Sequence, residues 1–140
     1  MTPEKIFRIV NTIILLPWLT MIIAPKAEIT ETIINSNIFP LGLAVVYAFY
    51  IFTTFGKSEG NFMSLAGVEK LFSKKEVLLA GWVHYLVFDL FVGAWEWRDA
   101  VQHDISQWIL APCLLLTLMF GPVGYLIYFV IRYFLIGMPF

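Results

Sequence analysis

Four long apolar stretches, separated by short polar segments, make up most of this chain. They cover approximately residues 6–24, 38–55, 77–97 and 108–136, and most of the charged residues lie between them. A helix needs about 20 consecutive apolar residues to cross a hydrocarbon core about 30 Å thick. The pattern therefore predicts an all-α polytopic membrane protein. We expect one integral membrane domain, residues 1–140, with four transmembrane helices in a bundle.

Composition supports this class. Hydrophobic residues make up 60% of the 140 residues and charged residues 14%, whereas soluble domains average about 25% charged residues. The formal net charge of −1 gives no basic field that would attract nucleic acid. Cys113 is the single cysteine, which excludes a disulfide within the chain and favours a packing role for this side chain.

The segment between the second and third stretches has its own pattern. Residues 56–67 are rich in glycine and polar residues, as in a loop, and apolar residues then recur at helical spacing over residues 65–72. We expect a short helix that lies on the membrane surface.

Lysine and arginine counts predict the orientation in the membrane. With four spans, the two termini and the middle loop share one side, which carries seven of the nine basic residues, Arg132 among them. Only Lys26 and Arg98 lie on the other side. The positive-inside rule then places both termini in the cytoplasm. The composition, and a first span that begins almost at once, suggest a bacterial inner membrane.

His84 and Asp89 stand near the middle of the third apolar stretch. An ionisable group at this depth costs at least about 2.5 kcal/mol on insertion scales, so such residues mark functional sites or pair with neighbouring helices. On an ideal helix the two side chains lie about 140° apart and about 7.5 Å apart along the axis, too far for a direct pair. Two explanations stay open: proton transfer chemistry, or hydrogen bonds that hold the helices together.

The fourth stretch is interrupted by Gly121-Pro122-Val123-Gly124. Proline removes a backbone donor and clashes with the preceding helical turn, so we expect a kink at Gly121-Pro122. A broken membrane helix is tolerated where protein or a cavity satisfies the freed carbonyls. If the break lies level with His84 and Asp89, these groups would line one pocket, although an ordinary proline kink explains the pattern equally well.

Polar residues also follow the third stretch. Arg98, Asp99, His103 and Asp104 are expected in a short outer loop, with Arg98 paired to a carboxylate or holding an acidic group of a ligand. Asp99 and His103, with Glu96 and Asp104 nearby, have a spacing that a divalent metal could use. No recognised metal-binding motif is present, so we predict no metal site and no cofactor.

A resemblance to a known family rests on this region. The string Trp82-x-His84-x-x-x-x-Asp89-Leu90-Phe91, followed by Asp99, Pro112 and the Gly121–Gly124 break, resembles the small integral membrane family that includes the plant neoxanthin synthases, also described as abscisic-acid-deficient-four-like. His84, Asp89 and Asp99 match the motif, whereas Glu96 and Arg98 do not belong to it. The resemblance covers about two thirds of the chain.

The resemblance implies acid and base chemistry on a carotenoid. The plant members are associated with converting violaxanthin to neoxanthin, an isomerisation that opens an epoxide, forms an allene and needs no redox cofactor. His84, Asp89 and Asp99 become the candidate catalytic residues. A polyene would suit a cavity lined by aromatic residues and by the break, although such aromatics more often simply pack. The candidate ligand-binding residues are Trp82, Tyr85, Phe88, Phe91, Trp95, Gly121 and Pro122.

Three function classes follow. The first is a membrane isomerase or related enzyme acting on a carotenoid or another isoprenoid lipid. The second is a noncatalytic protein that binds pigment or lipid, or assembles a membrane complex. The third is a small proton-coupled transporter, because an intramembrane aspartate near a histidine also suits a proton relay. The expected partners are a hydrophobic ligand and the membrane, and four helices leave room for a homo-oligomer.

Overall fold

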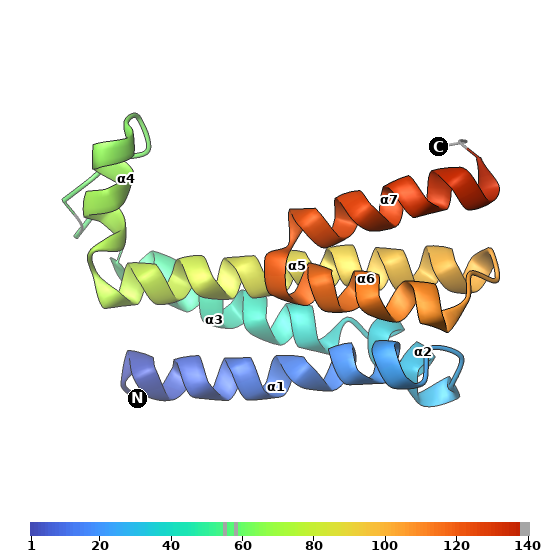
Figure 1. Cartoon of the computed structure of the whole chain (residues 1–140). Helices are drawn as coiled ribbons and strands as arrows, with labels where there is room; N and C mark the ends of the chain where they lie inside the picture. The colour runs from blue at the N-terminus through green and yellow to red at the C-terminus, as the bar shows by residue number, and fades with distance from the viewer. Residues whose placement is uncertain (55, 58, 138–140) are drawn as a thin grey trace. The chain divides into compact units, whose positions relative to one another are not determined.

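The computed structural model of the protein describes residues 1–54, 56–57 and 59–137, which form seven α-helices (Figure 1). By internal packing the chain divides into two compact units. Unit 1 contains Met1–Ile14 and Phe39–Val87, and unit 2 contains Leu15–Ile38 and the chain from Phe88 onward. The helices are α1 (Pro3–Ile23), α2 (Glu28–Asn35), α3 (Ile38–Thr54), α4 (Leu65–Phe72), α5 (Lys75–Gln102), α6 (Gln107–Phe120) and α7 (Pro122–Ile136).

The first three predicted spans are confirmed as helices. Three segments of the described chain are long and apolar enough to cross a membrane: Pro3–Ile23, Glu28–Thr54 and Lys75–Gln102. The helix expected over residues 65–72 is α4. The predicted end of the second span, Phe55, lies outside the described residues. Helix α2 was not predicted from the sequence. Helix α5 continues to Gln102, so Asp99 belongs to this helix and not to a loop.

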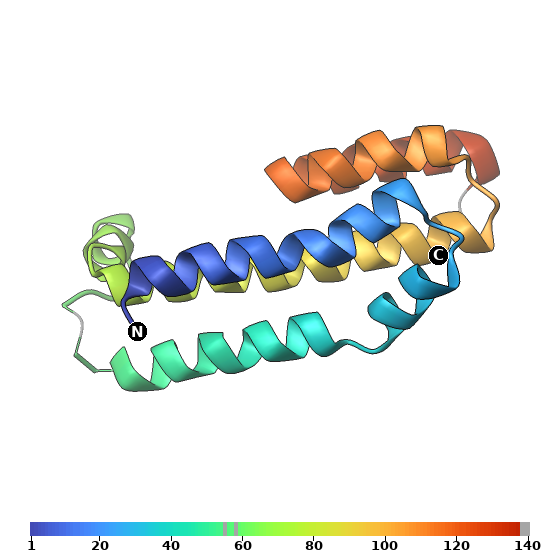
Figure 2. The ribbon, with the colours of Figure 1, turned by 90° about the horizontal axis from the view of Figure 1, so that it is seen from below.

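In unit 1, the first part of α1 and the first part of α5 run alongside α3 (Figure 2). The Trp82 indole on α5 donates a hydrogen bond of 3.0 Å to Asn11 Oδ1 on α1, and its ring lies 5.6 Å from Phe7. On the α3 side, the Tyr47 and His84 rings lie 5.5 Å apart. Aromatic contacts therefore join both neighbours to α5.

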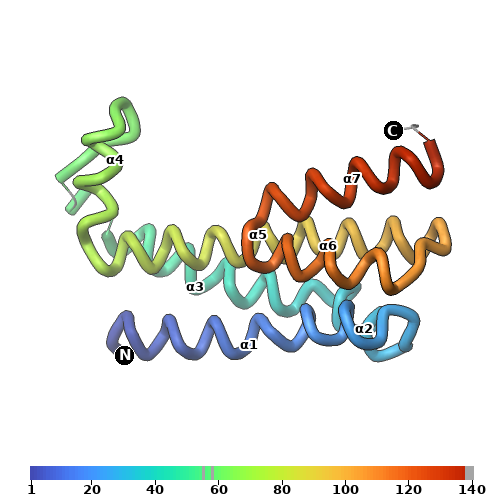
Figure 3. The backbone as a smooth tube through the Cα atoms, viewed as in Figure 1, coloured from blue at the N-terminus to red at the C-terminus, as the bar shows by residue number. Residues whose placement is uncertain are grey.

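In unit 2, the fourth apolar stretch is not one kinked helix. Helix α6 ends at Phe120, the chain reverses at Gly121, and α7 runs back beside α6 (Figure 3). Gly121 has φ +50° and ψ −107°, a backbone conformation that residues with a Cβ atom avoid. Pro122 lacks the backbone N–H that would continue the hydrogen bonds of α6. A Cβ atom on Gly124 would lie 2.1 Å from the Thr117 nitrogen, so this glycine lets the two helices touch.

The resulting α6–α7 hairpin corrects the predicted topology. Its helices have 14 and 15 residues, about 21 and 23 Å, which is too short to cross the hydrocarbon core. The four-span prediction placed Arg132 on the cytoplasmic side and Asp99 on the other side. Arg132 Nε donates to Asp99 Oδ2 at 2.8 Å, so the two side chains lie together and cannot be on opposite sides of the membrane.

We expect both ends of the hairpin to face the same side of the membrane. In a Cys113→Ala background, single cysteines at Ser106 and Leu135 should react with a membrane-impermeant maleimide added to one side of sealed vesicles. A cysteine at Ser64, before α4, should react from the opposite side. Labelling of the Ser106 and Leu135 positions from opposite sides would restore the four-span topology.

Candidate functional site

Three acidic side chains on the second half of α5 are buried. Asp89 is 8% exposed, Glu96 is fully buried, and Asp99 is 9% exposed. Asp89 is the fifteenth of the 28 residues of α5, so it lies at mid-helix. Carboxyl groups in an apolar interior are costly unless polar partners satisfy them, and the α6–α7 hairpin supplies partners.

Glu96 is held by α6. The Thr117 hydroxyl lies 2.8 Å from Glu96 Oε1 and 3.0 Å from Oε2 and donates to this carboxyl group, and both residues are fully buried. Glu96 is also close enough to Asp89 to interact with it electrostatically. Thr117 therefore provides a hydrogen bond for a fully buried acidic group.

Asp99 is held mainly by α7. Its Oδ2 accepts hydrogen bonds of 2.8 Å from the Tyr128 hydroxyl and from Arg132 Nε. His103, one turn further along the chain, places Nδ1 at 3.3 Å from Asp99 Oδ1. Three side chains thus surround one carboxylate, and a charge-assisted bond to arginine is among the stronger hydrogen bonds in proteins.

Asp89 lies against the tip of the hairpin. A Cβ atom on Gly121 would stand 2.9 Å from Asp89 Oδ1, so a larger residue here would displace this carboxyl group. Helix α7 starts at the next residue, and the amino end of a helix carries a partial positive charge that favours an acidic neighbour. The structure therefore places Gly121, at the break, beside Asp89.

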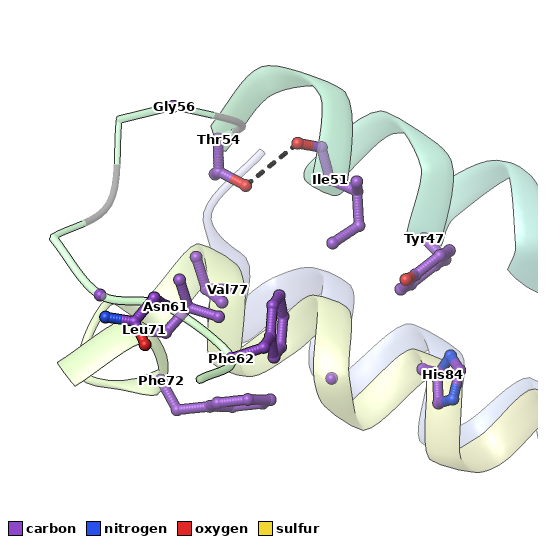
Figure 4. Close-up of a pocket in the computed structure, with 12 residues that line it drawn as sticks. Tyr47, Ile51, Thr54, Gly56, Asn61, Phe62, Leu71, Phe72, Val77 and His84 are labelled. Carbon is purple, nitrogen blue, oxygen red and sulfur yellow. Dashed lines mark hydrogen bonds between the residues drawn. The ribbon is translucent and has the colours of Figure 1, made fainter. Parts of the chain in front are cut away.

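His84 belongs to unit 1, whereas Asp89 belongs to unit 2. Besides its contact with Tyr47, His84 lines a cavity of about 450 Å³ formed within unit 1 by α3, α4, α5 and the loop before α4 (Figure 4). Joint action of His84 and Asp89 on one ligand stays a prediction.

The candidate aromatic residues lie on both halves of α5. In unit 1, the ring of Tyr85 lies 5.4 Å from that of Trp82. In unit 2, Phe88 and Phe91 are 6.2 Å apart, and Trp95 packs 5.6 Å from Tyr125 on α7. Trp82 and Trp95 are each 38% exposed, and Phe88 and Phe91 are more exposed still. A ligand held by these aromatics would therefore contact an outer surface of α5.

Arg98 has different partners from the carboxylate that was expected. Arg98 donates to Asn35 Oδ1 and to the Ile34 carbonyl, each at 3.4 Å, and the arginine beside Asp99 is Arg132. Lys26 lies 2.8 Å from Asp104 and holds the pKa of that carboxyl group below its usual value. Within the described part of the chain, no group of three or more His, Cys, Asp or Glu side chains is arranged to hold a metal ion.

Four residues of this region were missed or given little weight from sequence alone: Glu96, Thr117, Tyr128 and Arg132. Glu96 shares a helical stripe with Asp89, at a separation of seven residues, and this spacing was the available signal. No comparable signal pointed to Thr117, Tyr128 or Arg132, because their position depends on the reversal at Gly121.

Comparison with known proteins identifies the family. A model of the ABA DEFICIENT 4-like family matches residues 5–128. The chain belongs to the ABA DEFICIENT 4-like family. The matched region includes His84, Asp89, Asp99 and the tip of the α6–α7 hairpin.

One member of the ABA DEFICIENT 4-like family with a curated name is similar over most of the chain. Protein ABA DEFICIENT 4, chloroplastic, from Arabidopsis thaliana is 31% identical over 132 residues, which cover 88% of this chain and 59% of the relative. The match thus spans somewhat less than two thirds of the relative's length. No solved structure matches the chain significantly.

The contact between Gly121 and Asp89 predicts that a methyl group at position 121 lowers the stability of the folded protein. Gly121→Ala adds backbone strain of about 1–3 kcal/mol and a Cβ atom beside the Asp89 carboxyl group. Gly137→Ala is the matched control, because Gly137 also has a positive φ of +75° but nothing within 4 Å of its Cβ position. We expect thermal unfolding in detergent to show a larger loss of stability for Gly121→Ala. Equal losses would mean that the contact with Asp89 adds nothing.

The ion pair between Asp99 and Arg132 predicts a loss of stability when one partner is removed. Arg132→Met leaves the carboxylate without its cation, and a hydrogen bond to a charged group contributes about 2 kcal/mol. We expect a lower unfolding midpoint, partly recovered in the double variant Asp99→Asn/Arg132→Met. Lys26→Met breaks an exposed pair and should change little. An unchanged midpoint for Arg132→Met would contradict a stabilising role.

Proposed function

We propose that this protein is a membrane-embedded isomerase, or a related enzyme, that acts on a carotenoid or another isoprenoid lipid by acid and base chemistry. Membership of the ABA DEFICIENT 4-like family supports a carotenoid-related membrane protein. The observation that carries the chemical part is Asp89, a largely buried carboxyl group at the middle of an apolar helix beside a break in the backbone. Ionisable residues in membrane helices mark functional sites by default.

The proposed chemistry needs a proton donor and a proton acceptor. Opening an epoxide requires protonation of its oxygen, and removal of a proton from the neighbouring chain forms the new double bond. The product is an isomer of the substrate, so atoms balance and no oxidant or reductant is consumed. We propose Asp89 and His84 for these two roles. Asp99, which already accepts bonds from Tyr128 and Arg132, would position the second half of α5.

The re-entrant hairpin changes the proposed orientation. With three spans and a hairpin, six basic residues lie on the side of the amino terminus, Lys5 and Arg8 among them. Three lie on the other side: Lys26, Arg98 and Arg132. The positive-inside rule then places the amino terminus in the cytoplasm and the carboxyl end of α7 on the opposite side. We keep a bacterial inner membrane as the proposed location.

A noncatalytic role in binding a pigment or lipid, or in assembling a membrane complex, is the second candidate. Glu96 and Asp99 each have hydrogen-bonding partners within the protein, as expected of groups that hold helices together. A small proton-coupled transporter is the third candidate. The break beside Asp89 resembles the discontinuous helices of transporters, and Asp89-dependent proton flux in vesicles would favour it.

The enzyme proposal predicts loss of turnover without loss of fold. Asp89→Asn and His84→Ala should each lower product formation by about 10²–10⁴-fold, because each removes one proton-transfer group. The protein is expressed in cells that carry a carotenoid pathway, and extracts are compared by mass spectrometry and absorption spectra. Asp104→Asn, a change at an exposed carboxylate, is the control and should leave the products unchanged.

The outcomes separate the candidates. A new isomer that depends on Asp89 and His84 supports the enzyme. An unchanged pigment profile, with all variants present in the membrane, rules the enzyme out for the pigments supplied. Co-purification of an unaltered pigment at fixed stoichiometry then supports the binding role.

A further inference from the structure

The cavity in unit 1 has the size and lining of a small-molecule site. Its volume is about 450 Å³, and typical ligand pockets have about 300–1,000 Å³ and a mostly apolar wall with a few polar groups. The described residues that line it are Tyr47, Ile51, Thr54, Gly56, Gly60, Asn61, Phe62, Leu71, Phe72, Val77, Gly81 and His84.

The polar groups of this cavity lie at its two ends (Figure 4). Tyr47 and His84 are at one end, and Thr54 and Asn61 are at the other, with apolar side chains such as Phe62 between them. Thr54 is the last residue of α3, so its end of the cavity is level with the helix termini. His84 lies nine residues beyond the start of α5, about 13.5 Å along the helix axis. The cavity therefore extends from the carboxyl end of α3 to a point about 13.5 Å along α5.

Close packing holds the walls in place. The Phe72 ring lies directly on the backbone of α5, since a Cβ atom on Gly81 would stand 2.3 Å from it. The Asn61 backbone N–H donates to the Gly67 carbonyl at 3.2 Å, which ties the loop to α4. Asn61 and α4 thus form a wall that is already in place, so a ligand would not need to order it.

The lining determines the chemistry of the ligand. Among the described residues that line the cavity there is no Lys, Arg, Asp or Glu, so a charged head group would lack a counterion. The Thr54 hydroxyl donates to the Tyr50 carbonyl at 2.6 Å, which leaves its oxygen as a hydrogen-bond acceptor. A neutral hydroxyl group matches this end, and a hydrocarbon chain matches the apolar middle.

We infer that this cavity binds the hydroxylated end of an isoprenoid, with its hydroxyl group at Thr54 and its hydrocarbon extending toward His84. The inference rests on the proposed function, because it takes the isoprenoid class from there. It adds the place of binding, the direction of entry from the amino-terminal side, and a preference for an alcohol over a pure hydrocarbon.

The test uses two carotenoids that differ only in hydroxyl groups, zeaxanthin and β-carotene. The full chain is placed in lipid nanodiscs, and binding is measured by quenching of tryptophan fluorescence. Zeaxanthin should bind several-fold more tightly than β-carotene, as expected for one hydrogen bond. Thr54→Val should remove this difference. Thr53→Val is the matched control, because Thr53 makes the same kind of bond to the α3 backbone but is exposed and outside the cavity.

A second pair of variants tests the cavity itself. Ile51→Trp fills it and should abolish binding of both carotenoids, whereas Phe52→Trp, at a position 79% exposed, should not. Equal binding of the two carotenoids by the natural protein, or a zeaxanthin preference that survives Thr54→Val, would overturn the inference. Because Thr54→Val preserves side-chain shape, the test holds even if Ile51→Trp fails to fold.

Binding and turnover separate the two proposals. Zeaxanthin binding that depends on Thr54, without any new isomer in cells, supports the cavity and rules the enzyme out for the pigments supplied. A new isomer that persists in both Thr54→Val and Ile51→Trp supports the enzyme and overturns the cavity as its substrate site.

Discussion

The structure of unit 2 depends on the need to satisfy carboxyl groups in an apolar helix. Asp89, Glu96 and Asp99 are all carried by α5, and each would be costly if it faced lipid alone. The α6–α7 hairpin supplies hydrogen-bond donors to Glu96 and Asp99 and lies beside Asp89. Gly121 lies against Asp89, Thr117 donates to Glu96, and Tyr128 and Arg132 reach Asp99.

This requirement explains why the hairpin returns to the side from which it came. A single kinked span would carry Arg132 away from Asp99 and leave a buried carboxylate without its cation. Reversal at Gly121 keeps the two together at 2.8 Å, and the glycine at position 124 removes the Cβ that would hold the helices apart. The hairpin tip comes to mid-helix beside Asp89, where the amino end of α7 carries a partial positive charge.

Unit 1 uses α5 differently. Here the helix presents His84 to a cavity whose other walls are α3, α4 and the preceding loop. The buried carboxyl groups and the cavity are therefore two distinct environments along one helix. The α6–α7 hairpin covers the carboxyl groups, and we propose a lipid-like ligand for the cavity. The assignment of each residue to a chemical step is our proposal.

The sequence alone determined the class of the protein, the helices α1, α3, α4 and α5, and the family. These depend on local signals such as apolar length and helical spacing. Tertiary structure decided the rest. The Gly121–Gly124 sequence fits a kink and a reversal equally well, because both need a flexible residue before a proline. Only the contacts of Thr117, Tyr128 and Arg132 with α5 distinguish the two, and contacts between distant residues leave no periodic signal in one sequence.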